Sequence, residues 1–109
     1  MGVEVERGES IRTWEHPGLR RISRWRWGHA SGSECVHVEV GVLPDGRWYA
    51  ERGGVARAYP DEGDARAVAG NLMADREGWR EVPAVLGPDQ QPKEPGWVRR
   101  GGEWFREVS

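Results

Sequence analysis

Three side chains with nucleophilic or metal-binding chemistry lie close together in the sequence: His29, Cys35 and His37. Cys35 and His37 are two residues apart, so on a strand both would point to the same face. Structural zinc sites use four ligands, usually in closely spaced pairs, and the sequence has no CxxC or HxxxH. A catalytic thiolate needs cationic neighbours or a helix N-terminus, whereas Glu34 and Glu39 flank this pair. We therefore expect neither a metal centre nor a cysteine nucleophile.

Acidic residues also occur in pairs, Glu34 with Glu39 and Asp61 with Asp64. Catalytic carboxylate pairs need surroundings that separate their two pKa values, and no hydrophobic setting of that kind is visible here. A role at the start of a helix explains the second pair. The sequence also has no phosphate-binding glycine loop, nucleophile elbow or HExxH motif. We predict that the protein is not an enzyme and uses no cofactor.

The segment 20–29 contains four arginines and two tryptophans, which alternate over 24–27, and contains no acid. Single-stranded nucleic acid is held by arginines on its phosphates and by aromatic rings beneath its bases, so this segment could form such a surface. The alternative is an ordinary half-buried strand with tryptophans in the core and arginines in solvent. The residues predicted to form this surface are Arg20, Arg24, Trp25, Arg26 and Trp27.

A second group of aromatic residues beside arginines lies at the C-terminus. Residues 97–100 and 103–108 read as a β-hairpin around Gly101-Gly102, with Arg99 opposite Trp104. Exposed aromatic and arginine side chains dominate binding hot spots, although these rings could instead dock on the protein's own sheet. The residues predicted to contact a partner here are Trp97, Arg99 and Trp104.

We expect the strands and helix of the central stretch Glu34–Gly78 to position the candidate side chains described above. Valines alternate with other residues over 36–42, which predicts a strand with one buried valine face. A Pro-Asp-Gly turn then predicts a hairpin with a partner strand at 47–52, followed by a short third strand at 55–59. Asp61 suits a helix N-cap, and apolar residues then follow at helical spacing. We expect this helix to cover the valine face.

The flanking segments predict further strands. Residues 10–16 and 19–27 read as two strands joined by a turn at His16-Pro17-Gly18-Leu19, although 19–27 also fits one or two helical turns. Residues 79–82 predict a short edge strand. The fold class is therefore α+β: a meander-like antiparallel sheet of about four to six strands, with one helix at about 62–77 on one face and a C-terminal hairpin.

The predicted domain organisation has four parts. Residues 1–9 read as a flexible tail, 10–82 as a single α+β domain, and 83–96 as a proline-rich linker. Residues 97–109 form the hairpin, docked on this domain or on a second copy, because an isolated hairpin is unstable in water.

The order hairpin, short strand and alanine-bearing helix starting at Pro60-Asp61, over about Val36–Arg76, resembles the β-β-β-α modules of HicB-like antitoxins. This resemblance implies partner binding rather than catalysis.

Composition limits the class of function. The chain has 109 residues, a formal net charge of −2 and one cysteine. The slightly negative net charge argues against a protein that binds nucleic acid over its whole surface. A single cysteine cannot form an internal disulfide. No apolar run approaches a membrane span. We expect a cytoplasmic, non-enzymatic binding or adaptor module whose partner is a protein or a second copy. The alternative is a single-stranded nucleic-acid-binding protein.

Overall fold

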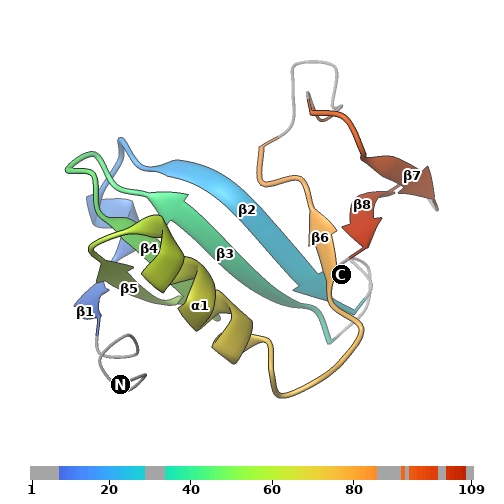
Figure 1. Ribbon diagram of the computed structural model, residues 1–109, viewed down its shortest axis with the longest axis horizontal. Helices are drawn as coiled ribbons and strands as arrows, with labels where there is room; N and C mark the ends of the chain where they lie inside the picture. Colours follow the sequence, from blue (N-terminus) through green and yellow to red (C-terminus); the bar gives the residue numbers. More distant parts are fainter. Residues whose placement is uncertain (1–7, 29–33, 86–91, 93, 101–102, 108–109) are drawn as a thin grey trace.

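The computed structural model describes residues 8–28, 34–85, 92, 94–100 and 103–107. Within these residues the chain forms an eight-stranded sheet with a single α-helix on one face (Figure 1). The strand order is β1-β5-β4-β3-β2-β6-β8-β7, and every pair is antiparallel. The α+β class is confirmed. The expected sheet of about four to six strands was too small, because the C-terminal hairpin, predicted as a separate unit, joins the same sheet through the pairing of β8 with β6.

In chain order the elements are β1 (Glu9–Ile11), the 3-10 helix η2 (Thr13–Glu15), β2 (Arg20–Trp27), β3 (Val36–Val42), β4 (Trp48–Arg52), β5 (Val55–Tyr59), α1 (Glu62–Leu72), β6 (Arg80–Val82), β7 (Val98–Arg100) and β8 (Glu103–Glu107).

The valine strand β3 lies at the centre of the fold, and α1 covers it as predicted. Val38 and Val40 are fully buried and pack against Ala65, Val68 and Ala69 of the helix. The alanines let the helix approach the sheet closely. The face under α1, which we call the helix face, therefore holds the main core, while the opposite side, the helix-free face, carries no described α-helix.

The helix begins where the sequence predicts but ends five residues earlier than the expected residue 77. The Asp61 side chain accepts a hydrogen bond from the Asp64 N–H at 2.9 Å, which caps the first turn. At the other end, Arg52 of β4 donates to the Leu72 carbonyl and forms an ion pair with Asp75. A side chain from the sheet thus satisfies a terminal carbonyl of the helix, a contact that helical periodicity does not reveal.

The N-terminal segment differs from the predicted hairpin. β1 pairs with β5, so three strands separate it from its expected partner β2. Thr13–Glu15 forms a 3-10 helix instead of continuing a strand. Ile11 and Leu19 pack against a small second cluster on Tyr49, so the connection between β1 and β2 crosses the helix-free face. β1 starts at Glu9, inside the predicted tail, and residues 1–7 of that tail lie outside the described residues.

The C-terminal hairpin has the predicted register, with Arg99 opposite Trp104. It docks on its own chain, because β8 pairs with β6. The strand β6 was expected at an edge but lies between β2 and β8. Of the predicted linker 83–96, residues 86–91 and 93 lie outside the described residues. No helix among the described residues is long and apolar enough to cross a membrane.

Candidate functional site

Charge is divided unequally between the two halves of the sheet. Among the described elements, the contiguous strands β2, β6, β8 and β7 carry eight arginines and three glutamates, a balance of plus five. The remaining elements, β1, η2, β3, β4, β5 and α1, carry three arginines and six acids, a balance of minus three. We call the first group of strands the basic half. The overall net charge of −2 does not reveal this concentration of positive charge.

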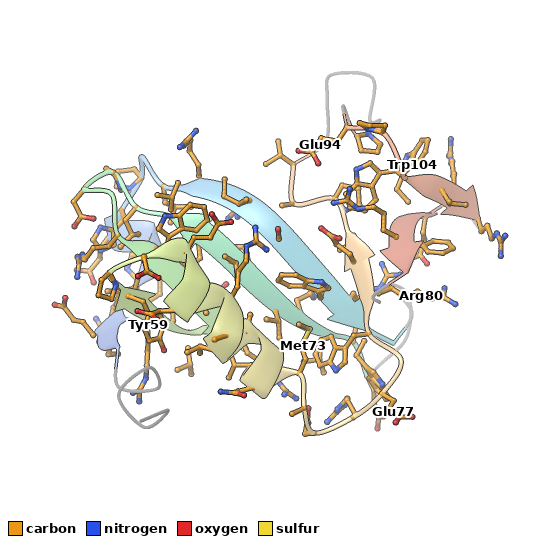
Figure 2. The ribbon with its side chains drawn as sticks, in the orientation of Figure 1. Tyr59, Met73, Glu77, Arg80, Glu94 and Trp104 are labelled. Atoms are coloured by element: carbon orange, nitrogen blue, oxygen red, sulfur yellow. The ribbon has the colours of Figure 1, made fainter. Side chains whose placement is uncertain are left out.

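The basic half is assembled from three separate parts of the sequence. β2 contributes four arginines, and β6 and the C-terminal hairpin add four more: Arg80, Arg99, Arg100 and Arg106. In Figure 2, Trp104 and Arg80 lie around β6 and β8, at the opposite end of the molecule from Tyr59. Sequence reasoning found β2 and part of the hairpin but did not bring them together.

The five residues predicted from the segment 20–29 do not form one surface. A bulge in β2 shifts its pairing with β3 between Arg21 and Ser23. The cross-strand pairs Trp25–Val38 and Trp27–Val36 place both tryptophans on the helix face, where they pack against the core. Arg24 and Arg26 consequently point to the helix-free face, while Arg20 is exposed beside Val42. The structure therefore favours the alternative of an ordinary half-buried strand whose tryptophans lie in the core.

Trp27 is further held in place by its neighbours. Its indole Nε1–H donates to the Glu77 carbonyl at 2.8 Å, and the Arg76 guanidinium lies 4.5 Å from its ring centroid. A ring fixed in this way has little surface left for stacking on a base.

The C-terminal hairpin brings the predicted residues Trp97, Arg99 and Trp104 together, and each tryptophan ring lies beside an arginine. The Arg106 guanidinium lies 4.2 Å from the Trp97 ring centroid, and Arg99 lies 5.9 Å from that of Trp104. Arg106 also forms an ion pair with Glu81 of β6 at 2.9 Å. The ion pair with Glu81 helps to dock the hairpin on the sheet, while Arg99 stays exposed.

A row of charged side chains crosses the helix-free face. Strand register aligns Arg24 of β2 with Glu39 of β3 and Glu51 of β4. Glu39 is buried, yet its carboxylate is well satisfied: Tyr49 donates to one oxygen at 2.8 Å, and Arg21 lies 3.3 Å from the other.

The two carboxylates influence the titration of their neighbours. Burial, followed by the hydrogen bond to Glu39, raises the pKa of Tyr49. Burial and the nearby Glu39 charge raise the pKa of Glu51, partly offset by Arg21 and Arg24. The sequence shows this pair once the turn is known, because Val42 opposite Trp48 places Glu39 opposite Glu51.

His37 is adjacent to this row, on the same face as Arg26. Burial and the charges of Arg24 and Arg26 lower the pKa of His37, while Glu39 raises it by less. Cys35 Sγ lies 3.9 Å from His37 Nε2, so the expected pairing on one face is present. His29 lies outside the described residues. No group of three potential metal ligands occurs among the residues that the structure describes.

Comparisons with protein-family models, with curated proteins and with solved structures found no match for this chain. The strand-strand-strand-helix order of β3, β4, β5 and α1 is present over the range that resembles HicB-like antitoxins, within a larger sheet. That resemblance stays a prediction.

Proposed function

We propose that this protein is a small binding module that recognises an acidic segment of a partner protein through the basic half of its sheet. The observation that carries this proposal is the balance of plus five on four contiguous strands in a chain whose overall charge is negative. Complementary charge of this kind steers association and sets specificity. Residues on the hairpin, Trp97, Arg99 and Trp104, are the predicted contacts.

The strand β7 offers a way to hold such a segment. It is the last strand in the sheet, all three of its residues are exposed, and no described strand pairs with its outer edge. An extended peptide can add to such an edge through main-chain hydrogen bonds. A second copy of β7 in antiparallel pairing would bring arginines against arginines, which is unfavourable. An acidic strand from another protein would instead neutralise them.

Single-stranded nucleic acid is the second candidate, because its phosphates are attracted by the same arginines. The tryptophans support it less. Trp25 and Trp27 face the core, and Trp97 has an arginine over its ring. Stacking platforms for bases need free ring faces.

The test is a titration of the full-length protein into two fluorescently labelled probes, a glutamate-rich decapeptide and an oligothymidine of the same length. We expect saturable binding of the peptide at low salt. Arg99→Glu should weaken it by about 1 kcal/mol, or roughly five-fold in Kd. Arg12→Glu is the matched control, because Arg12 is also exposed and lies 5.7 Å from a tryptophan ring, that of Trp14, outside the basic half.

The possible outcomes separate the two candidates. Tighter binding of the oligothymidine, with a steep salt dependence, would favour nucleic acid. Failure of both probes to bind at low salt would refute the proposed surface. Equal effects of Arg99→Glu and Arg12→Glu would show that overall charge, and not the basic half, attracts the peptide.

A further inference from the structure

Two hollows on the helix-free face meet at Arg24 and His37. The first, of about 400 Å³, extends over β3 and β4 to Glu51. The second, of about 300 Å³, extends over β6 to Val82 and Trp104. Because Arg24 and His37 line both, the hollows form one trough that runs across the strands. Each hollow has the size of a small-molecule site.

Arg24 is the cation in this trough whose bonding is incomplete. On the same strand, Arg21 forms an ion pair with Glu39, and Arg26 forms one with Glu103 at 2.9 Å. Arg24 forms no ion pair with the described residues, and its Nε–H is buried without a hydrogen-bond acceptor. Buried donors without a partner are rare in proteins, so the hydrogen bonding of the Arg24 guanidinium is incomplete where the residue lines both hollows.

The trough also contains an acid that has no cationic partner within hydrogen-bonding distance among the described residues. Glu51 accepts a hydrogen bond from the Thr13 side chain, while the Glu39 carboxylate between Glu51 and Arg24 is already bonded to Tyr49 and Arg21. Arg24 and Glu51 lie on β2 and β4, two strand spacings or about 10 Å apart at the backbone. Their long side chains can close on a small group that bears both charges.

The other end of the trough is less polar. Val82, Pro83 and Trp104 line it, together with Arg26 and Glu103, whose charges are paired with each other. Val82 is cross-strand neighbour to Arg24, so this wall adjoins the guanidinium directly. An apolar group attached to a carboxylate would therefore fit beside Arg24.

We propose that this trough binds a free α-amino acid with an apolar side chain. Its carboxylate accepts from the Arg24 guanidinium, its ammonium group faces Glu51, and its side chain lies against Val82 and Trp104. The amino acid uses the helix-free face and not the outer edge of β7, so the two proposals are tested separately, although Arg24 and Trp104 belong to both surfaces.

The experiment is a nuclear magnetic resonance titration of the full-length protein with L-phenylalanine. Arginine Nε–H signals are followed, and that of Arg24 is identified by its loss in Arg24→Gln. We expect a saturable downfield shift of this signal. Two analogues are compared, 3-phenylpropionate without the ammonium group and phenethylamine without the carboxylate, and each should bind about tenfold more weakly or worse.

Variants check the same contacts. Arg24→Gln and Glu51→Gln should each weaken phenylalanine binding about tenfold, whereas Arg20→Gln, an exposed position on the same strand, should leave it unchanged. Backbone amide spectra show whether each variant is folded, and the analogue series in the unaltered protein decides the question without any variant.

Three results would overturn the proposal. The first is an Arg24 signal that does not move with any probe, which would mean that water alone fills the trough. The second is 3-phenylpropionate binding as tightly as phenylalanine, which would exclude the contact to Glu51. The third is full affinity in a folded Arg24→Gln variant.

Discussion

The ion pair between Arg26 and Glu103 should determine whether the C-terminal hairpin stays on the sheet. Arg26 Nη2 lies 2.9 Å from Glu103 Oε2, and the two side chains are only 9% and 19% exposed. Arg26 Nε also donates to the Gly28 carbonyl at 3.0 Å. The pair spans from β2 to β8 across β6 and joins segments 77 positions apart in the sequence.

Arg26→Met keeps much of the side-chain length but removes the charge, leaving the Glu103 carboxylate without this partner. Removing one member of a fully buried pair costs about 3–5 kcal/mol. Glu103 keeps part of its surface in water, so we expect a loss of about 2–3 kcal/mol in the free energy of unfolding. For a chain of this length that loss lowers Tm by about 10 °C. Glu103→Gln should cost less, because its amide oxygen can still accept from Arg26.

The assay is urea unfolding of both single variants and of the double variant, with hydrogen exchange of the β8 amides. The double variant should be more stable than the sum of the single losses predicts, by about 1 kcal/mol or more. Exchange in β8 should rise more than in β3. Glu62→Gln is the control, since Glu62 forms an exposed pair with Arg66 on α1, and it should change stability by at most about 0.5 kcal/mol. Additivity within about 0.3 kcal/mol would refute the reasoning.

Three further predictions concern the carboxylates. Tyr49→Phe removes the donor to the buried Glu39 and should cost about 1.5–3 kcal/mol in urea unfolding; unchanged stability would contradict the observed bond. Because the pKa of Glu51 is raised in the folded state, its favourable contribution exists at low pH and is lost as pH rises, so Glu51→Gln should stabilise the protein at neutral pH but not near about pH 4. An equal gain at both pH values would exclude this account. Arg52 lowers the pKa of Asp75 from 3.8 to about 2, so its contribution is complete above pH 3.8 and is lost toward pH 2. Asp75→Asn should abolish that part of the acid sensitivity, and a pKa near 3.8 measured for Asp75 by magnetic resonance would refute it.

The basic half also has a consequence for truncation. Removing residues 97–109 would take away three of its eight arginines and two of its three glutamates. The net charge of the basic half would therefore change little. The larger effect would be the loss of β7, which supplies the free edge of the sheet. The proposed acidic segment would lose its strand partner, while the trough would lose Trp104.

Local patterns in the sequence determined the centre of the fold. Alternating valines predicted β3 and its buried face, the Pro-Asp-Gly turn predicted the pairing with β4, and Asp61 predicted the start of α1. These features depend on residues within a few positions of one another, where periodicity and turn chemistry decide the structure. The register of the C-terminal hairpin follows from the same local rules.

Only the tertiary structure decided which segments lie side by side. The pairings of β1 with β5, β6 with β2, and β8 with β6 join strands that are distant in the sequence. Each pairing includes β1 or β6, and the three residues of either strand give no period by which to match a partner. The early end of α1 likewise depends on Arg52 reaching from the sheet. The basic half and the trough at Arg24 arise from these contacts, so a linear reading could name several of their residues but not the surfaces they form.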